Sequence, residues 1–139
     1  MTADEILAGE TPTAGKLSRR AVKVVAKVTA DQTGIGAGPT DLTSFTTGSF
    51  TALANRHYRL SVKLAWLINT ATAGYDIFCY LDGVAAGSMC RIEGGAGQRG
   101  QATGWVMSTP SSGSRTWKAV ATRYGGTGTL DISNASGLD

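Results

Sequence analysis

The chain has 139 residues, of which 42% are hydrophobic and 17% are charged, and its formal net charge is +3. This length suits one domain, which buries about two-thirds of the surface of its unfolded chain, so folding requires neither a disulfide nor a structural metal. The charged fraction lies below the globular average of about 25%. A surface poor in charge is common where a protein packs against neighbours, although an ordinary β-sandwich has the same composition.

Residues 1–20 are predicted to form an extended N-terminal docking arm. The stretch has neither a helical stripe nor strand alternation, apart from a short helical segment near residues 3–7 that Thr2 or Asp4 would cap. The apolar run at its start is too short for a secretion signal, and no part of the sequence has the length of a membrane span. We therefore expect a protein that is made and used on the cytosolic side, or released by lysis.

Basic residues are concentrated at the junction between this arm and the rest of the chain. Five of the thirteen lysines and arginines fall within twelve residues, namely Lys16, Arg19, Arg20, Lys23 and Lys27. They form either a solvated strand face with a basic lead-in or an arm that docks on an acidic partner surface. Nucleic acid is a weaker candidate, because no aromatic residue interleaves with these charges and no binding motif surrounds them.

Residues 21–139 are predicted to form one β-sandwich domain. Apolar alternation and turn residues predict strands at 21–28, 58–67, 75–81, 84–92, 101–107, 115–124 and 129–133, with short and less regular strands at 42–46 and 49–53. The Gly-rich stretches at 34–39, 93–100 and 125–128 are predicted as loops or turns. Seven to eight antiparallel strands without a long amphipathic helix are typical of a β-sandwich or a jelly roll.

The two cysteines, Cys79 and Cys90, are predicted to be free. The Asp82-Gly83 pair favours a two-residue type I′ turn, which would place Cys79 opposite Ala86. Cys90 then lies four residues further along the partner strand, about 13 Å away at roughly 3.3 Å per residue, which is too far for a disulfide. Both side chains fall on the apolar face of the hairpin, so we expect buried, unreactive thiols.

No catalytic, metal-binding or cofactor-binding residue is predicted. His57 is the sole histidine, and we interpret it as structural or solvated. One histidine and two separated cysteines do not make a zinc site. A pair of carboxylates could in principle converge for glycoside hydrolysis, for example Asp76 with Glu93, but a solvated acid is ordinary where Asp76 begins a hairpin. The loop at 94–100 lacks the lysine and the following helix of a phosphate-binding loop.

The three tryptophans, Trp66, Trp105 and Trp117, lie in alternating strands, so the core is their default location. The strand that holds Trp105 has the least clear pattern. Trp105 is therefore the candidate for an exposed aromatic residue that faces a ligand, as in a lectin that stacks its aromatic side chain on a sugar.

Two parts of the chain resemble structural proteins of actinobacterial siphophages. Residues 9–17, Gly-Glu-Thr-Pro-Thr-Ala-Gly-Lys-Leu, are similar to the lead-in of many tail and minor structural proteins of these phages. Residues 58–132 resemble the β-domain of the same proteins. The segments that carry this resemblance are Tyr58-Arg-Leu-Ser-Val62, the Leu81-Asp-Gly83 turn, Pro110-Ser-Ser-Gly113, Thr116-Trp-Lys118 and Arg123-Tyr-Gly-Gly-Thr-Gly-Thr129. The resemblance covers residues 9–132.

This resemblance implies a virion component that is oligomeric, often a homotrimer, and that contacts the major capsid protein or other virion proteins. Members of the group often continue with one more strand, whereas this chain stops at residues 137–139. That strand is either absent or supplied by a neighbour. Tail members are also usually longer and carry this domain as one module. A single module with a short arm therefore fits a capsid decoration protein better than a tail fibre.

The leading functional hypothesis is a non-enzymatic capsid decoration (minor head) protein, without cofactors, that is located in the virion and assembled in the host cytoplasm. The arm would bind its partner through Ile6, Leu7, Leu17, Lys16, Arg19 and Arg20. The alternative is a minor tail or receptor-binding module that recognises host carbohydrate through Trp105. Membrane binding is not expected, and nucleic acid is disfavoured.

Overall fold

The computed structural model describes residues 26–27, 31–43, 49–133 and 137–138. These residues form strands joined by short turns and contain no α-helix, and hence no helix long and apolar enough to cross a membrane. The strands are β1 (Ala26–Lys27), β2 (Gln32–Ile35), β3 (Thr40–Asp41), β4 (Ser49–Ala52), β5 (Tyr58–Asn69), β6 (Ala73–Leu81), β7 (Val84–Gly94), β8 (Arg99–Ser108), β9 (Gly113–Gly126), β10 (Thr129–Ile132) and β11 (Gly137–Leu138).

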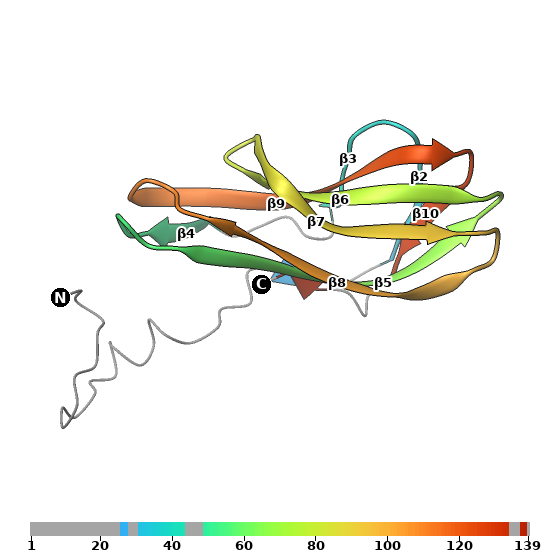
Figure 1. The fold of residues 1–139 in the computed structure, drawn as a ribbon, viewed down its shortest axis with the longest axis horizontal. Helices are drawn as coiled ribbons and strands as arrows, with labels where there is room; N and C mark the ends of the chain where they lie inside the picture. The colour runs from blue at the N-terminus through green and yellow to red at the C-terminus, as the bar shows by residue number, and fades with distance from the viewer. Residues whose placement is uncertain (1–25, 28–30, 44–48, 134–136, 139) are drawn as a thin grey trace, which may run out of the picture.

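The strands form two sheets that lie face to face (Figure 1). In sheet 1 the order is β8-β5-β10-β2, and β11 and β1 continue the sheet beside another part of the long strand β5. In sheet 2 the order is β7-β6-β9, and both β3 and β4 pair with β9. Each of these pairings is antiparallel.

The pairing is nested along the chain, and this nesting identifies the fold. The hairpin β6–β7 is innermost, β5 pairs with β8 outside it, β3 and β4 pair with β9, and β2 pairs with β10. A long antiparallel hairpin that rolls up in this way is a jelly roll. The interrupted pairs β1/β2, β3/β4 and β10/β11 each occupy one position, so the fold has eight strand positions. The predicted fold class is confirmed, and of its two forms the structure is the jelly roll.

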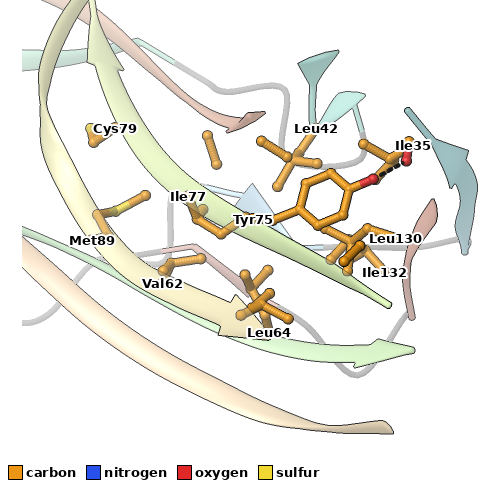
Figure 2. Packing of buried hydrophobic residues seen from close by; sticks show 14 of the residues in the cluster. Ile35, Leu42, Val62, Leu64, Tyr75, Ile77, Cys79, Met89, Leu130 and Ile132 are labelled. Carbon is orange, nitrogen blue, oxygen red and sulfur yellow. Dashed lines mark hydrogen bonds between the residues drawn. The ribbon is translucent and has the colours of Figure 1, made fainter. Parts of the chain in front are cut away.

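Alternation in the long strands creates the core between the sheets. Along β5, Leu60, Val62, Leu64 and Ile68 point inward and are buried, as the period of two requires. Side chains from β6 and β9, with Tyr75 near the centre, meet them from sheet 2 (Figure 2). Burial of each large aliphatic side chain stabilises the fold by about 1.5–3 kcal/mol before the cost of chain ordering.

Tyr75 places a polar group within this core. Its hydroxyl lies 2.7 Å from the carbonyl oxygen of Ile35 and 3.0 Å from that of Gly128. The contact with Ile35 is the dashed line in Figure 2. Burial raises the pKa of Tyr75, so the phenol stays protonated and able to donate. Tyr75 of sheet 2 therefore binds the last residue of β2 and the residue before β10, and so links sheet 2 to the β2–β10 pair of sheet 1.

Several predicted boundaries were wrong near the start of the domain. Gly34 and Ile35 were predicted in a loop but belong to β2, because Ile35 enters the core and the Gly34 amide donates to Asp131 Oδ1 at 2.8 Å. Of the strand predicted at 42–46, only residues 42 and 43 are described, and they directly follow β3, with the Leu42 amide donating to the Ala119 carbonyl at 3.0 Å. Of the strand predicted at 21–28, only residues 26–27 are described, as β1.

The predicted hairpin turn is confirmed. Asp82 and Gly83 both have positive φ, at 49° and 81°, as a type I′ turn requires. The register beyond the turn differs from the prediction, since Cys79 pairs with Gly87 instead of Ala86. The register shift between Cys79 and Tyr80 causes this difference, a second shift lies between Ile77 and Phe78, and the sequence contains no clear signal for either.

Both cysteines are free in the structure. Cys79 is fully buried, and Cys90, which pairs with Ile77, is half-buried against the core. Burial raises the pKa of Cys79 to about 12. Burial, helped by the charge of Asp76, raises the pKa of Cys90 to about 11. Both thiols are therefore protonated at neutral pH, which makes them poor nucleophiles.

The chain carries its own short last strand. Residues 137–138 form β11, which lies between β1 and β5, with Gly137 opposite Lys63 and Leu138 opposite Val62. The expectation that a further strand, as found in the phage proteins, is absent or supplied by a neighbour stays a prediction. Alternation could not reveal a strand only two residues long.

Candidate ligand-binding face

The outward face of β5 and β8 in sheet 1 carries Trp105, which is the most exposed large aromatic side chain among the described residues. The two strands pair along ten consecutive positions of β5, from Tyr58 to Leu67. Their outward cross-strand pairs are Arg59 with Met107, Ser61 with Trp105, and Lys63 with Thr103. Because side chains alternate along β5, Arg59, Ser61 and Lys63 point away from the core.

Trp105 is 57% exposed and Met107 is 48% exposed. The default expectation that all three tryptophans lie in the core is therefore wrong for Trp105, whereas Trp117 is buried and Trp66 is half-buried against the core. The reason is the phase of β8. Gly104 and Val106, on either side of Trp105 in the strand, point inward. Because successive side chains of a strand point to opposite faces, the indole of Trp105 points to solvent.

Gly104 explains why β8 lies close to sheet 2 at this point. A Cβ at position 104 would collide with the backbone carbonyl of Met89 in β7, so only glycine allows the two strands to approach this closely. A shallow depression of about 520 Å³ opens between β5 and β8 over this contact. Its lining residues are Arg59, Ser61, Val62, Lys63, Met89, Thr103, Gly104 and Trp105.

The cations on this face differ from those of sheet 2 in their pairing. Within the part of the chain that the structure describes, the side chains of Arg59 and Lys63 of β5 and of Arg99 of β8 make no ion pair or hydrogen bond. In the described part of sheet 2 and its turns, in contrast, three ion pairs join opposite charges. They are Arg91 with Asp76 at 2.8 Å, Arg115 with Asp82 at 3.0 Å and Lys118 with Asp41 at 2.8 Å. Sheet 1 thus presents uncompensated positive charge beside an exposed indole.

The acidic side chains of the described ranges are already engaged. Three are in the ion pairs above, and Glu93 accepts a hydrogen bond from the Tyr124 hydroxyl. Asp131 accepts from the Gly34 amide and from Asn69, and Asp31 also has a partner. On the outward face of sheet 1, Asp131 of β10 is thus held by two neutral amide donors, and no described acid pairs with Arg59 or Lys63.

A second depression, of about 540 Å³, lies on sheet 2 beside Tyr124. Here the aromatic ring is already in use. Tyr124 packs against Gly74, its hydroxyl donates to Glu93, and the Arg91 guanidinium lies over the ring at 4.4 Å from the centroid. Arg91 also binds Asp76 with two nitrogens, at 2.8 and 3.3 Å. The cluster joins three strands, and although Tyr124 remains 43% exposed, one face of its ring is already occupied by the Arg91 guanidinium.

This cluster also accounts for the two carboxylates considered for glycoside hydrolysis. Asp76 and Glu93 do share the outward face of sheet 2, but Asp76 is held by Arg91 and Glu93 by Tyr124. His57 is exposed, and its Nδ1 lies 2.7 Å from Thr109 Oγ1. Across the described ranges no three histidine, cysteine or acidic side chains gather as metal ligands.

The predicted arm residues Ile6, Leu7, Lys16, Leu17, Arg19 and Arg20 lie outside the described residues, as does the boundary at residues 20–21. Sequence reasoning selected Trp105 but missed Arg59 and Lys63, which line the same depression, as possible ligand-binding groups. Alternation places these cations and Trp105 on the outward faces of their own strands. Only the β5–β8 register shows that they lie beside one another.

Comparisons with known proteins give only distant likenesses. No family model matches the sequence, and a search of curated proteins finds no match. A chain from the structure of infectious bursal disease virus, Gx strain, is similar with a TM-score of 0.46 and 16% identity, over 84% of this chain and 31% of that chain. The C-terminal domain of EclA, a sugar-binding protein, is similar with a TM-score of 0.38 and 10% identity, over 86% of this chain and 79% of that domain. This chain spans about a third of the viral chain, and at these TM-scores neither likeness decides a function.

Proposed function

We propose that this chain is a structural protein of a bacteriophage particle, a capsid decoration (minor head) protein that binds the major capsid protein through residues 1–20. The observation that carries the proposal is the nested strand order of a jelly roll, an architecture found in viral capsid and lectin domains. A fold does not fix a function, so the proposal also rests on the phage-like sequence at residues 9–17 and in the β-domain.

In this proposal the arm and the jelly roll have separate roles. The apolar residues Ile6, Leu7 and Leu17 anchor the arm, while Lys16, Arg19 and Arg20 bind an acidic capsid surface. The jelly roll associates with its copies as a homotrimer and faces solvent. The protein catalyses no reaction and needs no cofactor, which is supported by the engagement of Asp76 and Glu93 by Arg91 and Tyr124.

Gold-labelled antibody against the chain, applied to intact particles and imaged by electron microscopy, tests the proposal. Label on heads is expected, and label confined to tails would overturn the decoration role. Removal of residues 1–20 should leave a domain with an unchanged β circular-dichroism spectrum that no longer binds particles lacking the native protein. Normal binding by the shortened chain would show that the arm is not the attachment site.

A second function, recognition of host-surface carbohydrate by a minor tail or receptor-binding module, is favoured by one specific observation. Trp105 is an exposed indole on a rigid, ten-position strand pair, beside hydroxyl side chains. Such a ring offers a flat apolar surface to the C–H groups of a sugar, while hydroxyl neighbours give orientation. A saturable change in tryptophan fluorescence on a glycan panel, lost in Trp105→Ala, would support this function.

A further inference from the structure

We propose that the depression beside Trp105 binds an anionic saccharide, a sugar that bears a carboxylate or a phosphate. This inference rests on the second of the two functions proposed above and names its ligand class. It does not depend on where on a particle the chain is located.

The first requirement is a surface for the sugar ring. Trp105 presents more than half of its side chain to solvent, and Ser61 lies directly opposite on β5. Thr103 lies on the same face of β8 and lines the same depression. The indole packs on the apolar side of a pyranose ring, and the two hydroxyls exchange hydrogen bonds with the sugar's own hydroxyls.

The second requirement is a counter-charge for the anionic group. Arg59 and Lys63 flank Ser61 along β5, each about 7 Å from it at roughly 3.3 Å per residue, so both long side chains reach a ligand seated on Trp105. Neither has a partner among the described residues. A carboxylate or phosphate between them makes charge-assisted hydrogen bonds without breaking an existing ion pair.

Preorganisation comes from the strands beneath the site. The close approach of Gly104 to the Met89 carbonyl holds β8 against β7, and the β5–β8 ladder fixes the positions of Trp105 and Ser61. The backbone therefore needs no rearrangement to admit a ligand, which lowers the entropic cost of binding.

A second copy of the chain fits this face less well. The acids that the structure describes all have partners already, so a carboxylate of a copy would have to give up an ion pair or a hydrogen bond in order to pair with Arg59 or Lys63. Without that exchange the two cations would be buried uncompensated, which is costly.

Single-stranded nucleic acid fits less well for a different reason. Binding of a strand uses several aromatic platforms for successive bases. Among the described outward residues of β5 and β8, Trp105 is the one aromatic side chain. A small ligand with one ring and one anionic group matches the site better.

Titration of the full chain with N-acetylneuraminic acid, glucuronic acid and glucose 6-phosphate, followed by calorimetry and tryptophan fluorescence, tests the inference. Glucose and N-acetylglucosamine serve as neutral comparisons. We expect at least one acidic sugar to bind about tenfold more tightly than its neutral counterpart, with this advantage reduced at 0.5 M salt. Arg59→Ala and Lys63→Ala should each remove most of it.

Lys118→Ala is the matched control, because it deletes a cation from sheet 2 and should leave sugar affinity unchanged. Trp105→Phe keeps a flat ring and guards against misfolding of Trp105→Ala, so binding should weaken in the first and vanish in the second. Equal binding of neutral and acidic sugars would overturn the anionic ligand while leaving carbohydrate recognition intact. No binding of any sugar would overturn both. Tighter binding of a dT12 oligonucleotide, or self-association abolished by Trp105→Ala, would also overturn the inference.

Discussion

The ring of Tyr124 lies so close to Gly74 that a Cβ on residue 74 would come within 2.5 Å of Tyr124 Cζ. Gly74→Ala should therefore push the ring outward and weaken both its hydrogen bond to Glu93 and its contact with Arg91. We expect the free energy of unfolding to fall by about 1–2 kcal/mol, as measured by urea denaturation. Gly95→Ala is the control, because nothing lies within 4 Å of its Cβ position, and it should be nearly neutral. Equal stability of the two variants would argue against the packing of Tyr124 on Gly74.

The buried hydroxyl of Tyr75 provides a second prediction. In Tyr75→Phe the carbonyl of Ile35 loses its bond to this hydroxyl, whereas the carbonyl of Gly128 keeps the bond from Arg123 at 3.0 Å. An unsatisfied buried carbonyl costs about 1–3 kcal/mol, which thermal and urea unfolding would detect. Tyr80→Phe removes a half-buried hydroxyl for which the described residues supply no hydrogen bond, and it should change stability by less than about 0.5 kcal/mol.

Asp82 makes stability depend on acid pH. The hydrogen bond from the Thr116 amide, followed by the one from Arg115, lowers the pKa of Asp82 below its ordinary value of 3.8. The folded state therefore favours the carboxylate, and this stabilisation is present above pH 3.8 and is lost as pH falls through the lowered pKa. Asp82→Asn keeps a turn-forming residue without the charge. Compared with the unsubstituted protein, this variant should have a measurably lower free energy of unfolding at pH 7, and the difference should shrink at pH 2–3. A difference that does not change with pH would mean that the substitution weakens the turn itself and not the interactions of the carboxylate.

The cysteines should react slowly in the native protein. At pH 8 the raised pKa values leave little thiolate, and Cys79 is also fully buried. A chromogenic disulfide reagent should therefore modify Cys90 before Cys79, and both should react within the mixing time in denaturant. Cys90→Ser isolates Cys79 for the measurement. Fast native modification of Cys79 would mean that β6 opens readily.

The sequence predicted those features that depend on neighbouring residues. Alternation in residues 58–67 gave the long strand β5 and its two faces, and Asp82-Gly83 gave the hairpin turn. Long-range relationships were not available in the same way. Trp105 was assigned to the core by default, because the phase of β8 is set by its pairing with β5 and its contact with β7, not by residues near it in the chain.

The same limit applied to register and to charge pairing. A shift of register in the β6–β7 ladder moved the partner of Cys79 by one residue. The pairing of Asp41 with Lys118 joins residues far apart in sequence, so alternation cannot foresee it. The unpaired state of Arg59 and Lys63, on which the proposed ligand site depends, became visible only when the partners of the other charges were known.

The nested strand order brings the two ends of the jelly roll together, since Ala26 in β1 pairs with Leu138 in β11. A short linker could therefore join these ends in a circular permutant, with new termini opened in the exposed turn at residues 96–98 between β7 and β8. For the same reason, a reporter protein joined after β11 would lie close to β1, whereas one inserted into that turn would be separated from both strands.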